Sequence, residues 1–176
     1  VPKQFADALT ADHAVFNEED ASRDKDQLAL VIQDRYTSWL QSYACKKKDT
    51  HDTLMSFQKF LGPQQKALHV YTDNSGEFQK ALEQLEVSHD TSTPYRPQTN
   101  GVAERAVRRV KEGTSATLVQ SGWHEAWWAD AMNCYCFLRN VVDKLHDGKT
   151  PNERRYGVPF EGPKIPFGAM VNYKPS

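Results

Sequence analysis

ALHVYTDNSGEF, residues 67–78, is the stretch that sets the fold. Its apolar run ends at Asp73 and predicts a buried strand with an acid at its carboxyl end. The polar residues 74–76 interrupt the run, and the apolar spacing of residues 77–85 predicts a short helix that leads to a weak strand at 87–91. A strand-helix-strand unit crosses over right-handed, so these two strands should be parallel neighbours.

Upstream of this unit, three short runs predict strands at residues 8–16, 28–32 and 36–44, and a helix follows at 50–61. Because the links between the three strands are short, an antiparallel meander is the natural arrangement. Joined to the parallel unit, the meander predicts an α/β fold in which a five-stranded mixed sheet carries helices on both faces.

Downstream, the periodicity predicts a long helix at residues 101–119 and another at 123–142. Residues 147–151 contain glycine and proline and should end the second helix. The remainder is rich in proline and glycine and is expected to form loop and short strand. We therefore predict a core domain at residues 1–148 and, at 149–176, an extension that begins a further module.

The composition limits the choice of function. The 176 residues carry a formal net charge of −1, with 39% apolar and 26% charged residues, as expected for one globular domain. Net charge gives no argument for nucleic-acid binding, so any polyanion must bind to a local positive surface. No apolar run approaches the roughly 18 residues of a membrane span, so no membrane association is expected.

The cysteines and the amino terminus suggest where the chain works. Cys45, Cys134 and Cys136 are odd in number and lack the spacing of a zinc site, which predicts free thiols in a reducing compartment. The first residues do not resemble a signal peptide, and the lack of an initiator methionine suggests an excised segment. A nuclear or cytoplasmic location is expected.

Three acids stand where the predicted sheet could bring them together. If the first and fourth strands are parallel neighbours, Asp12 and Asp73 converge at one edge, and Glu104 approaches from the long helix. Asp34 is a rival first acid, but it ends a strand that runs antiparallel to the first, so geometry favours Asp12. Structural explanations also exist, since Asp73 fits a turn or helix cap and Glu104 fits the helix macrodipole.

Three such carboxylates would suit magnesium, a hard cation that takes oxygen ligands and keeps several waters. Two ions held in this way could clamp a phosphodiester, one at the attacking oxygen and one at the leaving oxygen. Carboxylates gathered without a cation repel one another, so metal or protonation must offset their charge.

The long helix supplies positive charge beside the predicted acids. Glu104, Arg108 and Lys111 are spaced to share one helix face, while Ala103 and Val107 face the core together with Val110. The glutamate would thus continue into a cationic track suited to phosphates. An ordinary solvated face with a Glu–Arg pair is the competing interpretation.

The loop before this helix carries groups that could hold a DNA end. Tyr95 offers an aromatic ring, Arg96 a guanidinium, and Gln98 and Asn100 two amides. Such groups stack on bases or donate hydrogen bonds to them. The same composition also fits any surface loop.

Two blocks, YTDNSGEF at residues 71–78 and PYRPQTNGVAER at 94–105, resemble the catalytic core of retroviral and LTR-retrotransposon integrases. Further matches at 31–39 and 150–157 extend the resemblance over nearly the whole chain, while the first strand matches weakly. The resemblance implies a ribonuclease H-like fold and an Asp, Asp, Glu triad that works with Mg²⁺ or Mn²⁺. Members of the family trim the 3′ ends of element DNA and join them to target DNA.

When the family's motif is matched to this sequence residue by residue, the resemblance implies the triad Asp12, Asp73 and Glu104. The implied partners are double-stranded DNA and further copies of the chain, in a homodimer or higher multimer. The predicted DNA-binding residues are Asn74, Tyr95, Arg96, Gln98, Asn100, Arg105, Arg108 and Lys111. The segment between the second acid and the glutamate is shorter than the family usually has. A retroelement-derived domain that binds DNA or self-associates without catalysis therefore stays open as an alternative.

Overall fold

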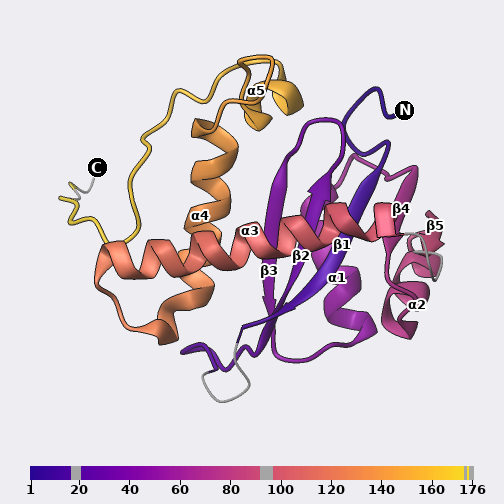
Figure 1. The fold of residues 1–176 in the computed structure, drawn as a ribbon, viewed down its shortest axis with the longest axis horizontal. Helices are drawn as coiled ribbons and strands as arrows, with labels where there is room; N and C mark the ends of the chain where they lie inside the picture. Colours follow the sequence, from indigo (N-terminus) through magenta and orange to yellow (C-terminus); the bar gives the residue numbers. More distant parts are fainter. Residues whose placement is uncertain (17–20, 92–96, 173, 175–176) are drawn as a thin grey trace.

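The computed structural model describes residues 1–16, 21–91, 97–172 and 174, with residues 97–100 described as backbone only. Its five-stranded sheet has the order β3-β2-β1-β4-β5 (Figure 1). The antiparallel meander and the parallel β1, β4 and β5 confirm the predicted topology. The strands are β1 (Leu9–Val15), β2 (Leu28–Asp34), β3 (Leu40–Cys45), β4 (His69–Thr72) and β5 (Ser88–Thr91).

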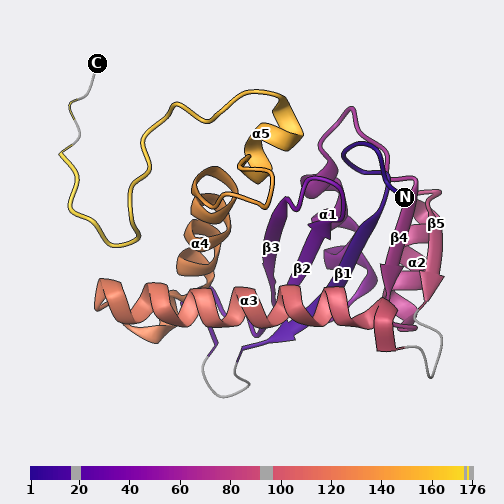
Figure 2. The ribbon, with the colours of Figure 1, turned by 45° about the horizontal axis from the view of Figure 1, so that its top comes forward.

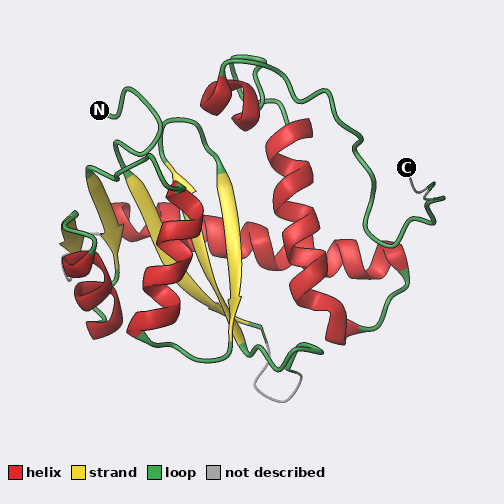
Figure 3. Cartoon of the chain, turned by 180° about the vertical axis from the view of Figure 1, so that it is seen from behind, coloured by secondary structure: helices red, strands yellow, loops and turns green. Residues whose placement is uncertain are grey.

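Helices cover both faces of the sheet. Helices α1 and α2 lie on one face, as the view from behind shows, and α3 crosses the other (Figures 1 and 3). Helix α4 packs against α3 and β3. The helices are α1 (Thr50–Leu61), α2 (Gly76–Gln84), α3 (Pro97–Ser121), α4 (Trp128–Val142) and α5 (Pro151–Tyr156), and the short 3₁₀ helix η1 (Glu125–Trp127) precedes α4.

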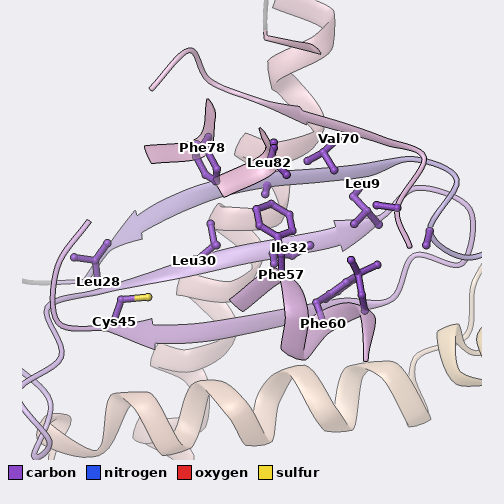
Figure 4. Packing of buried hydrophobic residues seen from close by; sticks show 14 residues of the cluster. Leu9, Leu28, Leu30, Ile32, Cys45, Phe57, Phe60, Val70, Phe78 and Leu82 are labelled. Atoms are coloured by element: carbon purple, nitrogen blue, oxygen red, sulfur yellow. The ribbon is translucent and has the colours of Figure 1, made fainter. Parts of the chain in front are cut away.

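Strand β2 connects the two cores because its side chains alternate between the faces. Leu30 and Ile32 pack toward α1 and α2, where Phe57 and Phe78 lie in the same cluster (Figure 4). Ala29 and Val31 belong to the opposite cluster, which also contains Val110 of α3 and Met132 of α4. Burial on both faces explains why β2 reads as a continuous apolar run rather than as an alternating one.

The predicted starts of one strand and one helix differ from the structure by four residues each. Strand β3 begins at Leu40 and not at residue 36, because the Asp34 carboxylate accepts hydrogen bonds from Thr37 and Ser38 has a positive φ of 62°, which together form a tight turn. Helix α3 begins at Pro97, inside the segment predicted as loop. Proline suits a first helical position because it has no N–H to leave unpaired.

The chain after α4 packs back onto the core. Helix α5 was not predicted; Thr150 and Glu153 form a capping box at its start. The Arg155 guanidinium lies 3.9 Å from the centroid of the Phe5 ring and donates to the carbonyl of Phe60. The following residues run back along α4 toward the end of α3 (Figure 2), where Phe167 lies beside Trp123. No strand forms in the described part of this stretch.

The helix predicted at residues 123–142 is divided in the structure. The 3₁₀ turn η1 precedes α4, and Trp128 is buried against Phe16 with ring centroids 4.4 Å apart. Trp123 remains 45% exposed.

All three cysteines are free thiols, as predicted. Among the described residues, no helix has both the length and the apolar character needed to cross a membrane.

Candidate active site

The register of the central parallel strands brings the first two acids together. Strand β1 pairs with β4 through Leu9 opposite Val70 and Thr10 opposite Tyr71. If this register is continued by two residues, Asp12 is level with Asp73 on the neighbouring segment. Neighbouring strands of a sheet lie about 4.8 Å apart. Leu9 and Val70 share the core under α1 and α2, so the two acids, three residues further along each chain, face α3.

Glu104 completes the group from α3, which packs across β1 and also touches β4. Burial raises the pKa of Asp12 above its ordinary value of 3.8, and the negative charges of Asp73 and Glu104 raise it further. The N–H of His13 donates to Asp12 Oδ1 at 2.8 Å and partly offsets these effects. The three acids named from the sequence are therefore electrostatic neighbours, held by three different elements.

A lysine that the sequence analysis did not identify also reaches this group. Lys48 follows β3, and its Nζ lies 3.8 Å from Asp73 Oδ2 and 3.1 Å from Glu77 Oε1. In a meander the third strand runs parallel to the first, so residues after β3 return to the edge where β1 and β4 end. That topological argument brings the lysines at residues 46–48 to this edge, but only the side-chain contacts distinguish Lys48 among them.

His13 follows Asp12 but faces the other side of the sheet. Its ring packs against Phe78 with centroids 4.8 Å apart. Burial and the nearby positive charge of Lys48 lower the pKa of His13 to about 4. The imidazole is therefore neutral at pH 7 and does not compensate the carboxylates, which supports its interpretation as a histidine of the strand rather than of the site.

The donor set fits a hard divalent cation. Asp12, Asp73 and Glu104 offer only carboxylate oxygens, the ligands that magnesium prefers. The pKa of Asp12 is raised first by burial and then by the negative charges of Asp73 and Glu104. Among the described residues, however, no three His, Cys, Asp or Glu side chains are spaced so that they could hold a metal ion as they stand.

The basic face of α3 is present as predicted. Arg105, Arg108 and Lys111 are exposed, whereas Ala103 and Val110 are buried. Positive side chains therefore continue from Glu104 along the solvent side of the helix, where phosphates could bind.

The remaining predicted DNA-binding residues are only partly described. Asn74 is exposed beside Asp73, and its Oδ1 accepts a hydrogen bond from Gln79. Tyr95 and Arg96 lie outside the described residues, and Gln98 and Asn100 are described only as backbone within the first turn of α3.

Asp34, the rival first acid, lies elsewhere. It pairs with Leu9 at the start of β1, so it stands at the edge of the sheet opposite to the site. Its carboxylate is fully buried and accepts hydrogen bonds from the N–H of Ala6 at 3.0 Å and of Thr37 at 2.6 Å. The geometry therefore assigns Asp34 to the turn after β2.

The burial of Asp12 near two other acids makes a prediction about stability. A raised pKa in the folded state means that ionised Asp12 destabilises the metal-free fold as the pH rises above 3.8. Asp12→Asn removes that charge and keeps the oxygen that accepts from His13. We expect its melting temperature without metal at pH 7 to exceed that of the wild type by roughly 2–4 °C, the shift from about 1 kcal/mol after allowance for solvent screening.

The measurement is differential scanning fluorimetry in chelator over a pH series. The gain should shrink as the pH falls toward 3.8, where Asp12 in the wild type is protonated as well. Asp24→Asn is the matched control, because Asp24 lies on the surface with its side chain 68% exposed, where no gain is expected. A melting temperature for Asp12→Asn equal to or below that of the wild type at pH 7 contradicts the destabilisation expected from burial of the Asp12 charge near the other two acids.

Comparison with known sequences finds similarity to retroelement polyproteins. It is 28% identical over 137 residues, 74% of its length, to the retrovirus-related Pol polyprotein from transposon RE2 of Arabidopsis thaliana, and 28% identical over 144 residues, 78% of its length, to that of transposon RE1. The matched parts make up 9% and 10% of those relatives, so the chain spans about a tenth of their length. No protein-family model matches the chain.

Comparison with solved structures identifies the fold. The catalytic core domain of BIV integrase matches with a TM-score of 0.64 at 19% identity, covering 84% of this chain and 92% of that one. The HTLV-2 integrase catalytic core domain, solved in complex with magnesium, matches with a TM-score of 0.67 at 20% identity, covering 87% and 98%. A chain of the simian T-cell lymphotropic virus intasome, solved with PP2A regulatory subunit B56 gamma, gives 0.69 at 20% identity, covering 98% and 60%.

These comparisons agree with the sheet order and with the helices on both of its faces. The chain has the ribonuclease H-like fold of retroviral integrase catalytic cores, and its sequence relatives are the Pol polyproteins of retroelements.

Proposed function

We propose that the chain is the catalytic domain of a retroelement integrase, which trims the 3′ ends of element DNA and joins them to target DNA. The convergence of Asp12, Asp73 and Glu104 from β1, β4 and α3 carries this proposal. The Pol polyprotein relatives and the integrase folds of the structural neighbours support it.

In this proposal the three carboxylates are the ligands of Mg²⁺ or Mn²⁺, with two ions when DNA is bound. The neighbouring HTLV-2 core was solved with magnesium, which supports this choice of cation. When bound, the metal would activate the attacking oxygen and stabilise the leaving oxygen of the phosphodiester. The protein contributes position, since Asp12 lies in β1, Asp73 directly follows the adjacent β4, and Glu104 lies on a helix packed against the sheet.

The proposed DNA surface begins at this site. Arg105, Arg108 and Lys111 would bind phosphates along α3, and Asn74 lies beside the second acid. The intasome match and the dimeric and trimeric forms of the HTLV-2 core support double-stranded DNA as ligand and a homodimer or higher multimer as the working form. We expect copies of the chain to meet at a surface that includes Trp123, which is 45% exposed.

A branched DNA that mimics the joined product tests the function without knowledge of the element's end sequence. In the reverse of joining, a 3′-hydroxyl beside the branch attacks the branch phosphodiester, reseals the target strand and releases the element end. Each turnover forms one phosphodiester and breaks one, so no further reactant is needed. We expect a resealed target strand that requires Mg²⁺ or Mn²⁺ and disappears in chelator.

The other products of this assay separate the alternatives. Nicked strands without resealing contradict the integrase proposal and indicate a hydrolytic nuclease. DNA binding without any product favours the second candidate, a retroelement-derived domain that has lost catalysis. That candidate is favoured by one observation, namely that Lys48 stands beside Asp73 where a metal ion is expected.

A further inference from the structure

Lys48 links the candidate metal site to a carboxylate outside the triad. Its Nζ lies 3.1 Å from Glu77 and 3.8 Å from Asp73, so the contact with Glu77 is the closer one. The Glu77 side chain is 16% exposed, against 39% for that of Asp73 and 43% for that of Lys48. A less exposed partner is less screened by water, which makes Glu77 the stronger anchor for the ammonium group.

The local fold explains this arrangement. Asp73 directly follows β4 and Glu77 lies in the first turn of α2, so a tight connection holds both carboxylates at one edge of the sheet. The Asp73 carboxylate also accepts a hydrogen bond from the N–H of Ser75 at 3.3 Å, which ties it to that connection. Lys48 approaches from the link between β3 and α1, where the side chain of Asp49 caps the helix.

The positive charge of Lys48 also reaches Asp12, where it counteracts part of the repulsion from Asp73 and Glu104. One ammonium group thus acts on two of the three proposed metal ligands while a fourth carboxylate anchors it. A divalent cation at the same two acids would lie within a few ångströms of this charge, and like charges at such separations repel measurably even in a high dielectric.

We propose that Lys48, anchored on Glu77, is a positioning residue that serves as the internal counter-cation of Asp12 and Asp73, and that a divalent metal ion must compete with it. This inference rests on the proposed metal site. It also assigns a role to Glu77, because the Glu77 carboxylate can remain paired with the Lys48 ammonium group when a metal ion binds Asp73.

The two residues should change metal affinity in opposite directions. Lys48→Met keeps the aliphatic stem and removes the charge, so we expect Mg²⁺ to bind about three- to tenfold more tightly. Glu77→Gln removes negative charge near the site and leaves Lys48 with Asp73 as its remaining partner, so we expect about three- to tenfold weaker binding. The double variant should return close to the wild-type affinity, and Lys48→Arg should stay close to it.

Isothermal titration calorimetry of the whole chain with MgCl₂ at constant ionic strength measures these affinities, with circular dichroism to check that each variant is folded. Lys47→Met is the matched control: it removes the same charge one residue away, from a side chain that pairs with Asp49 at 3.2 Å. Its affinity should remain near that of the wild type. Because the effect of Lys48 is electrostatic, the gain in Lys48→Met should also shrink as salt is added.

The outcomes separate this inference from the proposed function. If Mg²⁺ binds the wild type and Asp73→Asn abolishes that binding, but Lys48→Met binds no more tightly than Lys47→Met, the metal site stands and the competition by Lys48 is wrong. If Lys48→Met binds Mg²⁺ and the wild type does not, the competition is supported in its strongest form. If neither protein binds Mg²⁺, both proposals fail.

Discussion

Asp73→Asn and Glu104→Gln should each lower the rate of metal-dependent resealing of branched DNA by at least about 10³-fold, because a metal ion contributes several kcal/mol of charge stabilisation to the transition state. Each substitution replaces a charged oxygen ligand by a neutral amide of the same shape. The fold should persist, since Asp73 is 39% exposed and Glu104 is exposed. In the Asp73→Asn variant, the amide oxygen can still accept the hydrogen bond from the N–H of Ser75.

Two matched substitutions show whether this loss belongs to the site. Glu112→Gln removes an exposed carboxylate from the same helix as Glu104, and Asp90→Asn removes one from β5, where Asp90 pairs with His69 at 2.7 Å. Both should reseal DNA at nearly the wild-type rate. All four variants should bind duplex DNA in a fluorescence anisotropy titration, because the basic face of α3 is unchanged. Robust resealing by Asp73→Asn would overturn the assignment of the triad.

The central arrangement of the site could be predicted from the sequence because it depends on local patterns. The apolar run that ends at Asp73, the helix after it and the weak strand at residues 87–91 require a parallel crossover, and the short links upstream require a meander. The further supposition that the first and fourth strands are parallel neighbours would bring Asp12 beside Asp73, and the observed order β3-β2-β1-β4-β5 confirms that adjacency. The spacing on α3 likewise predicted the buried face of Ala103 and Val110.

The features that were missed depend on particular side-chain contacts. Residues 36–39 have the aromatic and apolar character of a strand, but the buried carboxylate of Asp34 turns the chain there. The ion pair between Lys48 and Glu77 joins elements that are distant in sequence. Helix α5 is a different case, because its capping box at Thr150 and Glu153 and the proline at its first position are visible in the sequence.

Asp34→Ala should destabilise the fold by about 3–5 kcal/mol, the largest stability effect that we expect from a single substitution in this chain. The carboxylate is fully buried and accepts three hydrogen bonds, from the N–H of Ala6 and from both the N–H and the hydroxyl of Thr37. Alanine would leave two buried backbone N–H groups without their acceptor. The melting temperature should fall by roughly 10 °C or more for a domain of this size.

Chemical denaturation followed by tryptophan fluorescence measures this loss, with Asp24→Ala as the surface control for removal of a carboxylate. Asp34→Asn should fall between the wild type and Asp34→Ala, because the amide keeps one acceptor but turns an NH₂ group toward a donor. The measurement also decides between Asp34 and Asp12 as the first acid. A folded Asp34→Ala protein that retains wild-type stability but loses Mg²⁺ binding would move Asp34 into the site. An Asp34→Ala protein that loses stability would leave Asp34 to the turn, and loss of Mg²⁺ binding in a folded Asp12→Asn protein would assign Asp12 to the metal.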